Sequence, residues 1–405
     1  MKHGAAWLRQ GLPGGVSARY ARRGCMAMLS AAMGETGMNR IAAAFLAILF
    51  FAPPAMAAAL IEESVKLPAA FPGTLGTTTD DLDALVIRPD DGRRHPLAVI
   101  NHGAPRDARA RQRMVPSEMR GMAQEFARRG WVAVTFMRRG YGASEGSYAE
   151  STGPCDTASY EPSGRASAQD VREVIRLLRA KPYVDGTKVI SVGHSAGGFA
   201  TVALTADPPP GLVAAISFAG GRGSNRPDEI CNAPGLIDAF AGFGRTSRIP
   251  MLWVYAENDH YFGPALARQL HAAFTAAGGK AEFVAAPSFG EDGHHMFGRS
   301  GSAIWTRYVD AFLAEQNLRL VDQLLPLDPP AMGYPGGLGE RGRVGFLDYL
   351  DAGRHKAFVL SYDGHYAWRS DSESVADAVE EALAWCRKLA GHSCHTVMTD
   401  DKPPS

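Results

Sequence analysis

The stretch VISVGHSAGGF places Ser195 between Gly193 and Gly197, where two segments of different character meet. Residues 189–192 are β-branched or small and predict a short buried strand, whereas the alanine-rich residues 196–204 predict a helix. A serine at such a corner is turned outward, and glycines on either side keep Cβ atoms out of a crowded turn. In a chain this rich in glycine, G-x-S-x-G can arise by chance. The motif alone therefore does not identify a catalytic serine, and the surrounding sequence has to be considered.

A serine hydroxyl is a weak nucleophile at neutral pH, and it needs a base, an acid to orient that base, and donors for an oxyanion. Asp259 follows the hydrophobic run MLWVYA, and His294 lies in the glycine-containing loop FGEDGHHMF. The order serine, acid, histidine predicts Ser195 as nucleophile, Asp259 as orienting acid and His294 as base. The alternatives are Glu257 for the acid and His295 for the base.

Backbone amides are the expected oxyanion donors. The amide of Ala196 directly follows the nucleophile, and the amide of Ala104 lies in NHGAP, just after the predicted strand LAVI. His102 in the same stretch is expected to shape this loop rather than to carry a proton. Tyr141 is interpreted as a packed aromatic side chain.

These residues require a sheet that brings several loops to one edge. From Leu82 to Phe312, apolar runs alternate with amphipathic segments, which predicts a mostly parallel sheet of about eight strands flanked by helices. One helix is expected around ASAQDVREVIRLLRA, with Ser167 and Asp170 capping its start. Loops after parallel strands share the carboxyl edge, where such sheets bind ligands.

With NHGAP, RRGYGASEG, GHSAGG, AEND and EDGHHMF in this order, residues 82–299 resemble the dienelactone-hydrolase-like and prolyl-oligopeptidase-like branch of the α/β-hydrolase superfamily. The resemblance implies an α/β-hydrolase fold and no cofactor. True dienelactone hydrolases use cysteine as nucleophile, so the serine here implies an esterase. Prolyl-oligopeptidase-like enzymes usually carry a large amino-terminal propeller, for which this chain has no space.

The amino-terminal sequence has the pattern of an export signal. Met38-Asn39-Arg40, the apolar run IAAAFLAILFFA and the small-residue site Ala55-Met56-Ala57 predict a secretory signal cleaved after Ala57. Residues 1–37 are interpreted as an upstream extension. The mature chain would be mildly acidic and periplasmic or secreted, with no stable membrane span and no electrostatic reason to bind nucleic acid.

The four remaining cysteines allow three pairings in an oxidising compartment. We expect Cys155 to pair with Cys231 and Cys386 with Cys394, because each pair then falls within one structural unit; four free thiols are the alternative. The first bridge would join two long loops, residues 141–165 and 220–247, and this suggests a stiff lid over the site.

The pattern divides the chain into residues 1–57 (removed), a catalytic domain 58–318, a proline- and glycine-rich linker 319–345 and a small α+β module 346–405. In the module, KAFVLS and HYAWRS predict strands around a turn, and Ser374 with Asp377 predicts a helix start. Nothing in the module's sequence identifies a partner.

The chain lacks the spacing of a known metal site and of a nucleotide-binding loop, so no metal or cofactor is predicted. The residues together predict a serine hydrolase that cleaves a small-molecule carboxylic ester through an acyl-enzyme. A prolyl-oligopeptidase-like peptidase is the alternative, although no unambiguous anchor for a peptide terminus is found. A non-catalytic binding protein on the same fold is a second alternative.

Overall fold

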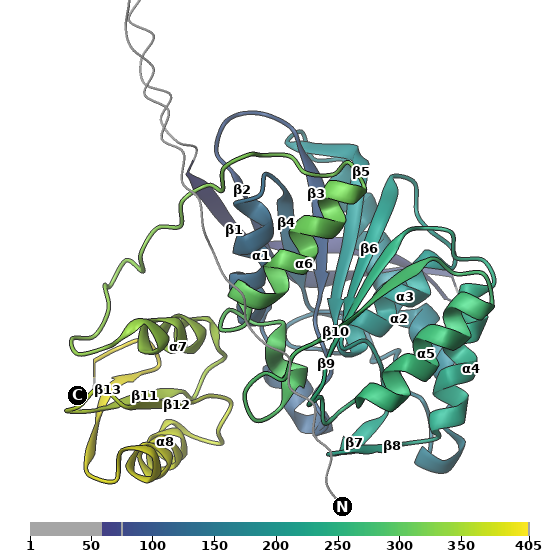
Figure 1. Ribbon diagram of the computed structural model, residues 1–405. Helices are drawn as coiled ribbons and strands as arrows, with labels where there is room; N and C mark the ends of the chain where they lie inside the picture. The colour runs from purple at the N-terminus through teal and green to yellow at the C-terminus, as the bar shows by residue number, and fades with distance from the viewer. Residues whose placement is uncertain (1–58, 74–75, 404–405) are drawn as a thin grey trace, which may run out of the picture. The chain divides into compact units, whose positions relative to one another are not determined.

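The computed structural model describes residues 59–73 and 76–403 (Figure 1). The expected upstream extension and signal peptide lie outside these residues. Within the described ranges, no helix is long and apolar enough to cross a membrane.

The central sheet has eight strands in the order β1-β2-β4-β3-β5-β6-β9-β10. Strand β2 alone runs antiparallel to both of its neighbours, and the other pairs are parallel. The predicted mostly parallel sheet of about eight strands is therefore confirmed. The strands are β1 (Leu60–Gly73), β2 (Gly76–Pro89), β3 (His95–Asn101), β4 (Val132–Phe136), β5 (Val184–His194), β6 (Leu212–Phe218), β9 (Met251–Ala256) and β10 (Ala281–Ala286).

Helices cover both faces of the sheet (Figure 1). Successive side chains of a strand point to opposite faces, so an apolar strand presents apolar side chains to both helix layers. Leu97 and Val99 of β3 pack in the cluster that contains α2, α3, α4 and α5, whereas Ala98 and Ile100 pack in the cluster that contains α1 and α6. The helices are α1 (Arg120–Ala127), α2 (Tyr160–Arg179), α3 (Ala196–Thr205), α4 (Ala233–Gly244), α5 (Pro264–Ala276) and α6 (Ser302–Glu315).

The carboxy-terminal residues form the small α+β module that the sequence predicts. Its three-stranded sheet, ordered β12-β11-β13, packs against α8 and α7. Helix α7 begins before the expected module boundary, inside the stretch interpreted as linker. The elements are α7 (Glu340–Asp351), β11 (Ala357–Ser361), β12 (Tyr366–Arg369), α8 (Val375–Ala390) and β13 (Cys394–Thr399). We refer to residues 340–403 as the terminal segment.

Two cysteine pairs are bonded as expected. Cys155 is joined to Cys231 and Cys386 to Cys394. The first bridge connects the two long loops, and the hairpin β7 (Ser224–Arg226) and β8 (Glu229–Ile230) lies within the second of them. The second bridge ties the end of α8 to the start of β13.

Candidate active site

Ser195 lies at the turn between β5 and α3 in a conformation that non-glycine residues rarely adopt. Its φ is 57° and its ψ is −121°. A Cβ on Gly193 would overlap the carbonyl oxygen of Gly197, and a Cβ on Gly197 would overlap the carbonyl oxygens of Asn101 and His102. The two glycines therefore allow the strained turn that holds Ser195 at the end of its strand.

His294 and Asp259 form a buried hydrogen-bonded pair from the loops after β10 and β9. The distance between His294 Nδ1 and Asp259 Oδ2 is 3.1 Å, and each residue is at most 3% exposed. A carboxylate can only accept, so Nδ1 carries the proton and Nε2 is left free to receive one. Burial raises the pKa of Asp259, but the hydrogen bonds from His294 and from the amides of Phe262 and Tyr261 outweigh it and hold that pKa below its usual value.

The loop that carries His294 is fixed by several contacts that the sequence did not predict. Asp292 Oδ1 accepts from the amides of His294 and His260 at 2.9 and 3.0 Å. Tyr261 stacks on the imidazole of His294, with ring centroids 3.8 Å apart. Gly293 fits because a Cβ there would overlap Ala256. The motif EDGHHMF thus contains, in Asp292, the carboxylate that holds its own loop.

His194, the residue before the nucleophile, also holds this loop. Its Nε2 donates to the carbonyl oxygen of His294 at 2.7 Å. Burial and, after it, the nearby His294 lower the pKa of His194 to about 3, so the ring is neutral at physiological pH. The sequence carried no signal for this role beyond the position of His194 in the motif.

Ser195 and His294 line one cavity of about 500 Å³ together with Ala104 and His295. Among the described residues, the Ser195 hydroxyl makes no hydrogen bond, so the serine and the base are not joined directly. Hydrogen bonds of this kind are often long in the free enzyme and shorten when substrate binds.

The structure places His294 rather than His295 against Asp259. Glu257 is exposed and forms no pair with either histidine. No group of three or more His, Cys, Asp or Glu side chains within the described ranges has the geometry of a metal site.

His102 is held as a neutral, structural histidine. Its Nε2 accepts from the backbone amide of Arg138 at 3.1 Å, so Nδ1 carries the proton and donates to the carbonyl oxygen of Gly103 at 2.6 Å. Burial lowers the pKa of His102, and the charge of Arg138 lowers it further. These bonds fix the backbone that presents Ala104 to the cavity. Among the described residues, the amides of Ala104 and Ala196 donate to no acceptor.

The buried carboxylate of Glu150 helps to hold the backbone at His102, through Arg138. Glu150 is 1% exposed and binds the guanidinium groups of Arg138 and Arg222, while Tyr141 donates to its Oε2 at 2.9 Å. Burial raises the pKa of Glu150, but the two arginines lower it far more and keep the group ionised. Arg138 Nη1 in turn donates to the carbonyl oxygen of His102 at 2.8 Å. Tyr141 is a packed aromatic, as interpreted from the sequence.

The two disulfide-bonded loops do not cover the cavity. None of the described residues in 141–165 or 220–247 lines it. The loops meet instead through the Cys155–Cys231 bridge and the Glu150–Arg222 ion pair. The hypothesis of a disulfide-stiffened lid is therefore wrong, because position after a strand does not fix the direction in which a long loop folds.

Residues 77–270 match the family described as X-Pro dipeptidyl-peptidase (S15 family). No curated protein matches the chain.

Similar solved structures include an esterase of Pyrococcus furiosus, with 11% identity, TM-score 0.45 and coverage of 63% of this chain and 90% of that one. Esterase 2 of Thermogutta terrifontis, phosphorylated by paraoxon, has 20% identity, TM-score 0.45 and coverage of 64% and 96%. Dipeptidyl peptidase 4 of Porphyromonas gingivalis has 16% identity and TM-score 0.45, and the match covers 63% of this chain and 35% of that one.

The strand order explains how distant parts of the chain meet at one edge. Three of the parallel strands, β5, β9 and the edge strand β10, end at the loops that contain Ser195, Asp259 and His294. This sheet order, the serine-bearing turn between strand and helix, and the family match place the chain in the α/β-hydrolase superfamily.

Proposed function

We propose that the protein is a serine hydrolase that cleaves carboxylic esters through an acyl-enzyme. The observation that carries the proposal is the buried His294–Asp259 pair, whose histidine lines the same cavity as the strained Ser195. The family match supports a hydrolase of the esterase or peptidase type.

In the first half-reaction, Ser195 Oγ attacks the ester carbonyl and its proton passes to His294 Nε2. Asp259 stabilises the imidazolium and keeps the ring oriented. The amides of Ala196 and Ala104 donate to the oxyanion of the tetrahedral intermediate. His294 then protonates the departing alcohol, and in the second half-reaction it activates the water that releases the acid.

A peptidase is the second candidate, and the match to the X-Pro dipeptidyl-peptidase family favours it. The two differ in the leaving group, because an amide nitrogen must be protonated as it departs whereas an alkoxide or phenolate leaves more easily. Ester hydrolysis does not require a binding site for a peptide terminus. The two disulfides support an oxidising compartment, periplasmic or extracellular.

The test is intact-mass labelling of the mature chain with a fluorophosphonate, beside Ser195→Ala. The same two proteins are assayed with p-nitrophenyl acetate and with an X-Pro p-nitroanilide. We expect one adduct and ester turnover that are both lost in Ser195→Ala, by about three orders of magnitude or more. Comparable turnover of the anilide would establish the peptidase instead. A folded protein that forms no adduct and turns over neither substrate would refute both.

A further inference from the structure

The outer wall of the Ser195 cavity comes from the terminal segment. Five of its residues line the cavity together with Ser195 and His294. They are Asp348, Ala352, Trp368, Ser370 and Asp371. The wall therefore begins more than fifty residues beyond His294, the last predicted catalytic residue in the sequence.

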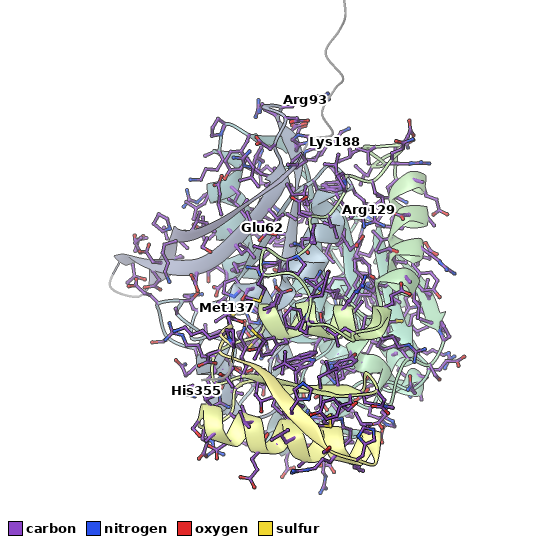
Figure 2. All side chains as sticks on the ribbon, turned by 90° about the vertical axis from the view of Figure 1, so that its left-hand side faces the viewer. Glu62, Arg93, Arg129, Met137, Lys188 and His355 are labelled. Carbon is purple, nitrogen blue, oxygen red and sulfur yellow. A yellow bond between two sulfur atoms is a disulfide. The ribbon has the colours of Figure 1, made fainter. Side chains whose placement is uncertain are left out.

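This wall is attached by a buried ion-pair cluster. Asp351 is 5% exposed and binds Arg299 and Arg120, the latter at 2.7 Å between Nη1 and Oδ1. Ser117 Oγ donates to the backbone carbonyl of Asp351 at 2.8 Å. Arg120 also contacts Glu62, labelled in Figure 2, at 3.0 Å. A buried carboxylate with two guanidinium partners fixes the direction in which α7 meets the catalytic part of the chain.

Trp368 is the large aromatic side chain of this wall. It lies on β12 opposite Phe358 of β11 and packs against the apolar cluster that contains Phe346 and Tyr349. Its ring is only half-buried. A ring held on one side by a packed cluster and open on the other offers contact area at little cost in conformational entropy.

Trp368 and Ser370 also line a second cavity of about 1020 Å³ in the terminal segment. Its other lining residues include the apolar or aromatic Tyr366, Trp385 and Leu389 and the charged Glu340, Arg341 and Arg369. We call it the terminal-segment groove. The Ser195 cavity and the groove share two lining residues, Trp368 and Ser370, and so lie next to each other.

We propose that Trp368 is a specificity-determining residue that binds the part of an extended ester substrate remote from the scissile bond. The inference rests on the proposed ester hydrolysis and adds to it the substrate class: carboxylic esters with a long apolar or aromatic chain. An acetyl group fills a small part of about 500 Å³, and ligand cavities bury most of the surface of the molecule they bind. Trp368 lines the cavity that holds Ser195 and also borders the groove, so a long chain on an ester bound at Ser195 can contact it.

The experiment compares kcat/KM for two series of esters with increasing chain length. One series is the p-nitrophenyl esters of ω-phenyl fatty acids, and the other is the acetates of ω-phenyl alcohols; p-nitrophenyl acetate is the short reference. In the wild type, we expect kcat/KM to rise with chain length in one of the series. Trp368→Ala should lower the value for the longest ester of that series about tenfold and leave the short reference unchanged.

Two further variants keep the test decisive. Trp368→Leu retains apolar bulk against Phe346 and Phe358 if the alanine variant does not fold, and it should show most of the loss. Tyr362→Ala removes an aromatic side chain of the same segment that is 86% exposed and outside both cavities, and it should change neither value.

The possible failures are distinguishable. If the reference ester is hydrolysed but Trp368→Leu affects both ester lengths equally or neither, Trp368 does not bind substrate and only this inference fails. Faster hydrolysis of long esters by the variant would also overturn it, because Trp368 would then be a barrier. If the wild type hydrolyses no ester, the proposed function fails and this inference with it.

Discussion

Two regions of the molecule could cover the site, and they are held in different ways. The loops 141–165 and 220–247 are joined by a disulfide and by the Glu150–Arg222 ion pair, yet none of their described residues lines the Ser195 cavity. The terminal segment is docked through the ion pairs of Asp351, and it forms the outer wall. The covalent bridge therefore stabilises the fold, whereas a non-covalent cluster sets the boundary of the cavity.

The largest effect is expected from Glu150→Gln in the first region. The amide leaves Arg138 and Arg222 buried without a counter-charge, and this should lower the free energy of unfolding by about 3–5 kcal/mol. Because Arg138 also holds His102, kcat for p-nitrophenyl acetate should fall as well. Chemical denaturation and steady-state kinetics measure the two effects. Glu161→Gln, which removes a half-exposed pair with Arg165, is the control and should cost less than about 1 kcal/mol.

Replacing both Cys155 and Cys231 by serine tests whether the bridge acts on the fold alone. The bridge closes a loop with a sequence separation of 76, so its loss should cost about 2–4 kcal/mol. The value of kcat/KM for p-nitrophenyl acetate should stay the same at a temperature where the variant is folded. The Cys386–Cys394 bridge spans a separation of only 8, and its removal should cost less. A tenfold fall in kcat/KM when Cys155 and Cys231 are replaced would contradict this expectation and would mean that the two loops act on the active site.

Asp351→Asn addresses the second region. The substitution weakens the bonds to Arg120 and Arg299, so the free energy of unfolding should fall by about 1–3 kcal/mol. We expect kcat/KM to fall more for a long ester than for p-nitrophenyl acetate, because the wall loses its fixed position while the Ser195 turn does not. An equal loss for both esters would mean that the cluster acts on the catalytic residues themselves.

Stability should also depend on pH through Glu118, which lines the cavity beside the terminal segment. Burial and the charge of Asp371 raise the pKa of Glu118 from its ordinary value of 4.5 to about 8. Between these values the folded state binds more protons than the unfolded state, so stability falls as pH rises. Glu118→Gln should flatten that slope and raise the stability at pH 8 relative to pH 4.5, by an amount on the order of a few kcal/mol at most. The measurement is thermal unfolding of both proteins across this pH range. Identical slopes of stability against pH for the wild type and for Glu118→Gln would contradict the raised pKa of Glu118.

Much of the fold follows from local pattern, and the failures have local reasons. Ser374 Oγ accepts from the amide of Asp377, so that helix begins where its capping pair predicts. Ser167 and Asp170 have the same spacing but lie inside α2, where Asp170 binds Arg139. Strand β1 lies before Leu82, where the predicted pattern begins, and its Pro68 and Pro72 are tolerated because it is an edge strand.

The site was less predictable than the fold. Chain order and strand ends predict the positions of Ser195, Asp259 and His294, because parallel strands deliver their loops to one edge. The contacts of His194 and Glu150 join residues far apart in the sequence, such as the hydrogen bond between His194 and His294. The cavity wall depends on how the terminal segment docks, and no periodicity encodes that docking.

The hydrogen bond from His194 has a mechanical consequence. The nucleophile follows His194 by one peptide bond, and the loop of the base is fastened to the same side chain. A movement of the end of β5 therefore displaces Ser195 and the backbone of His294 together. The distance that the proton must cross between the serine and the histidine then changes less than the position of either residue.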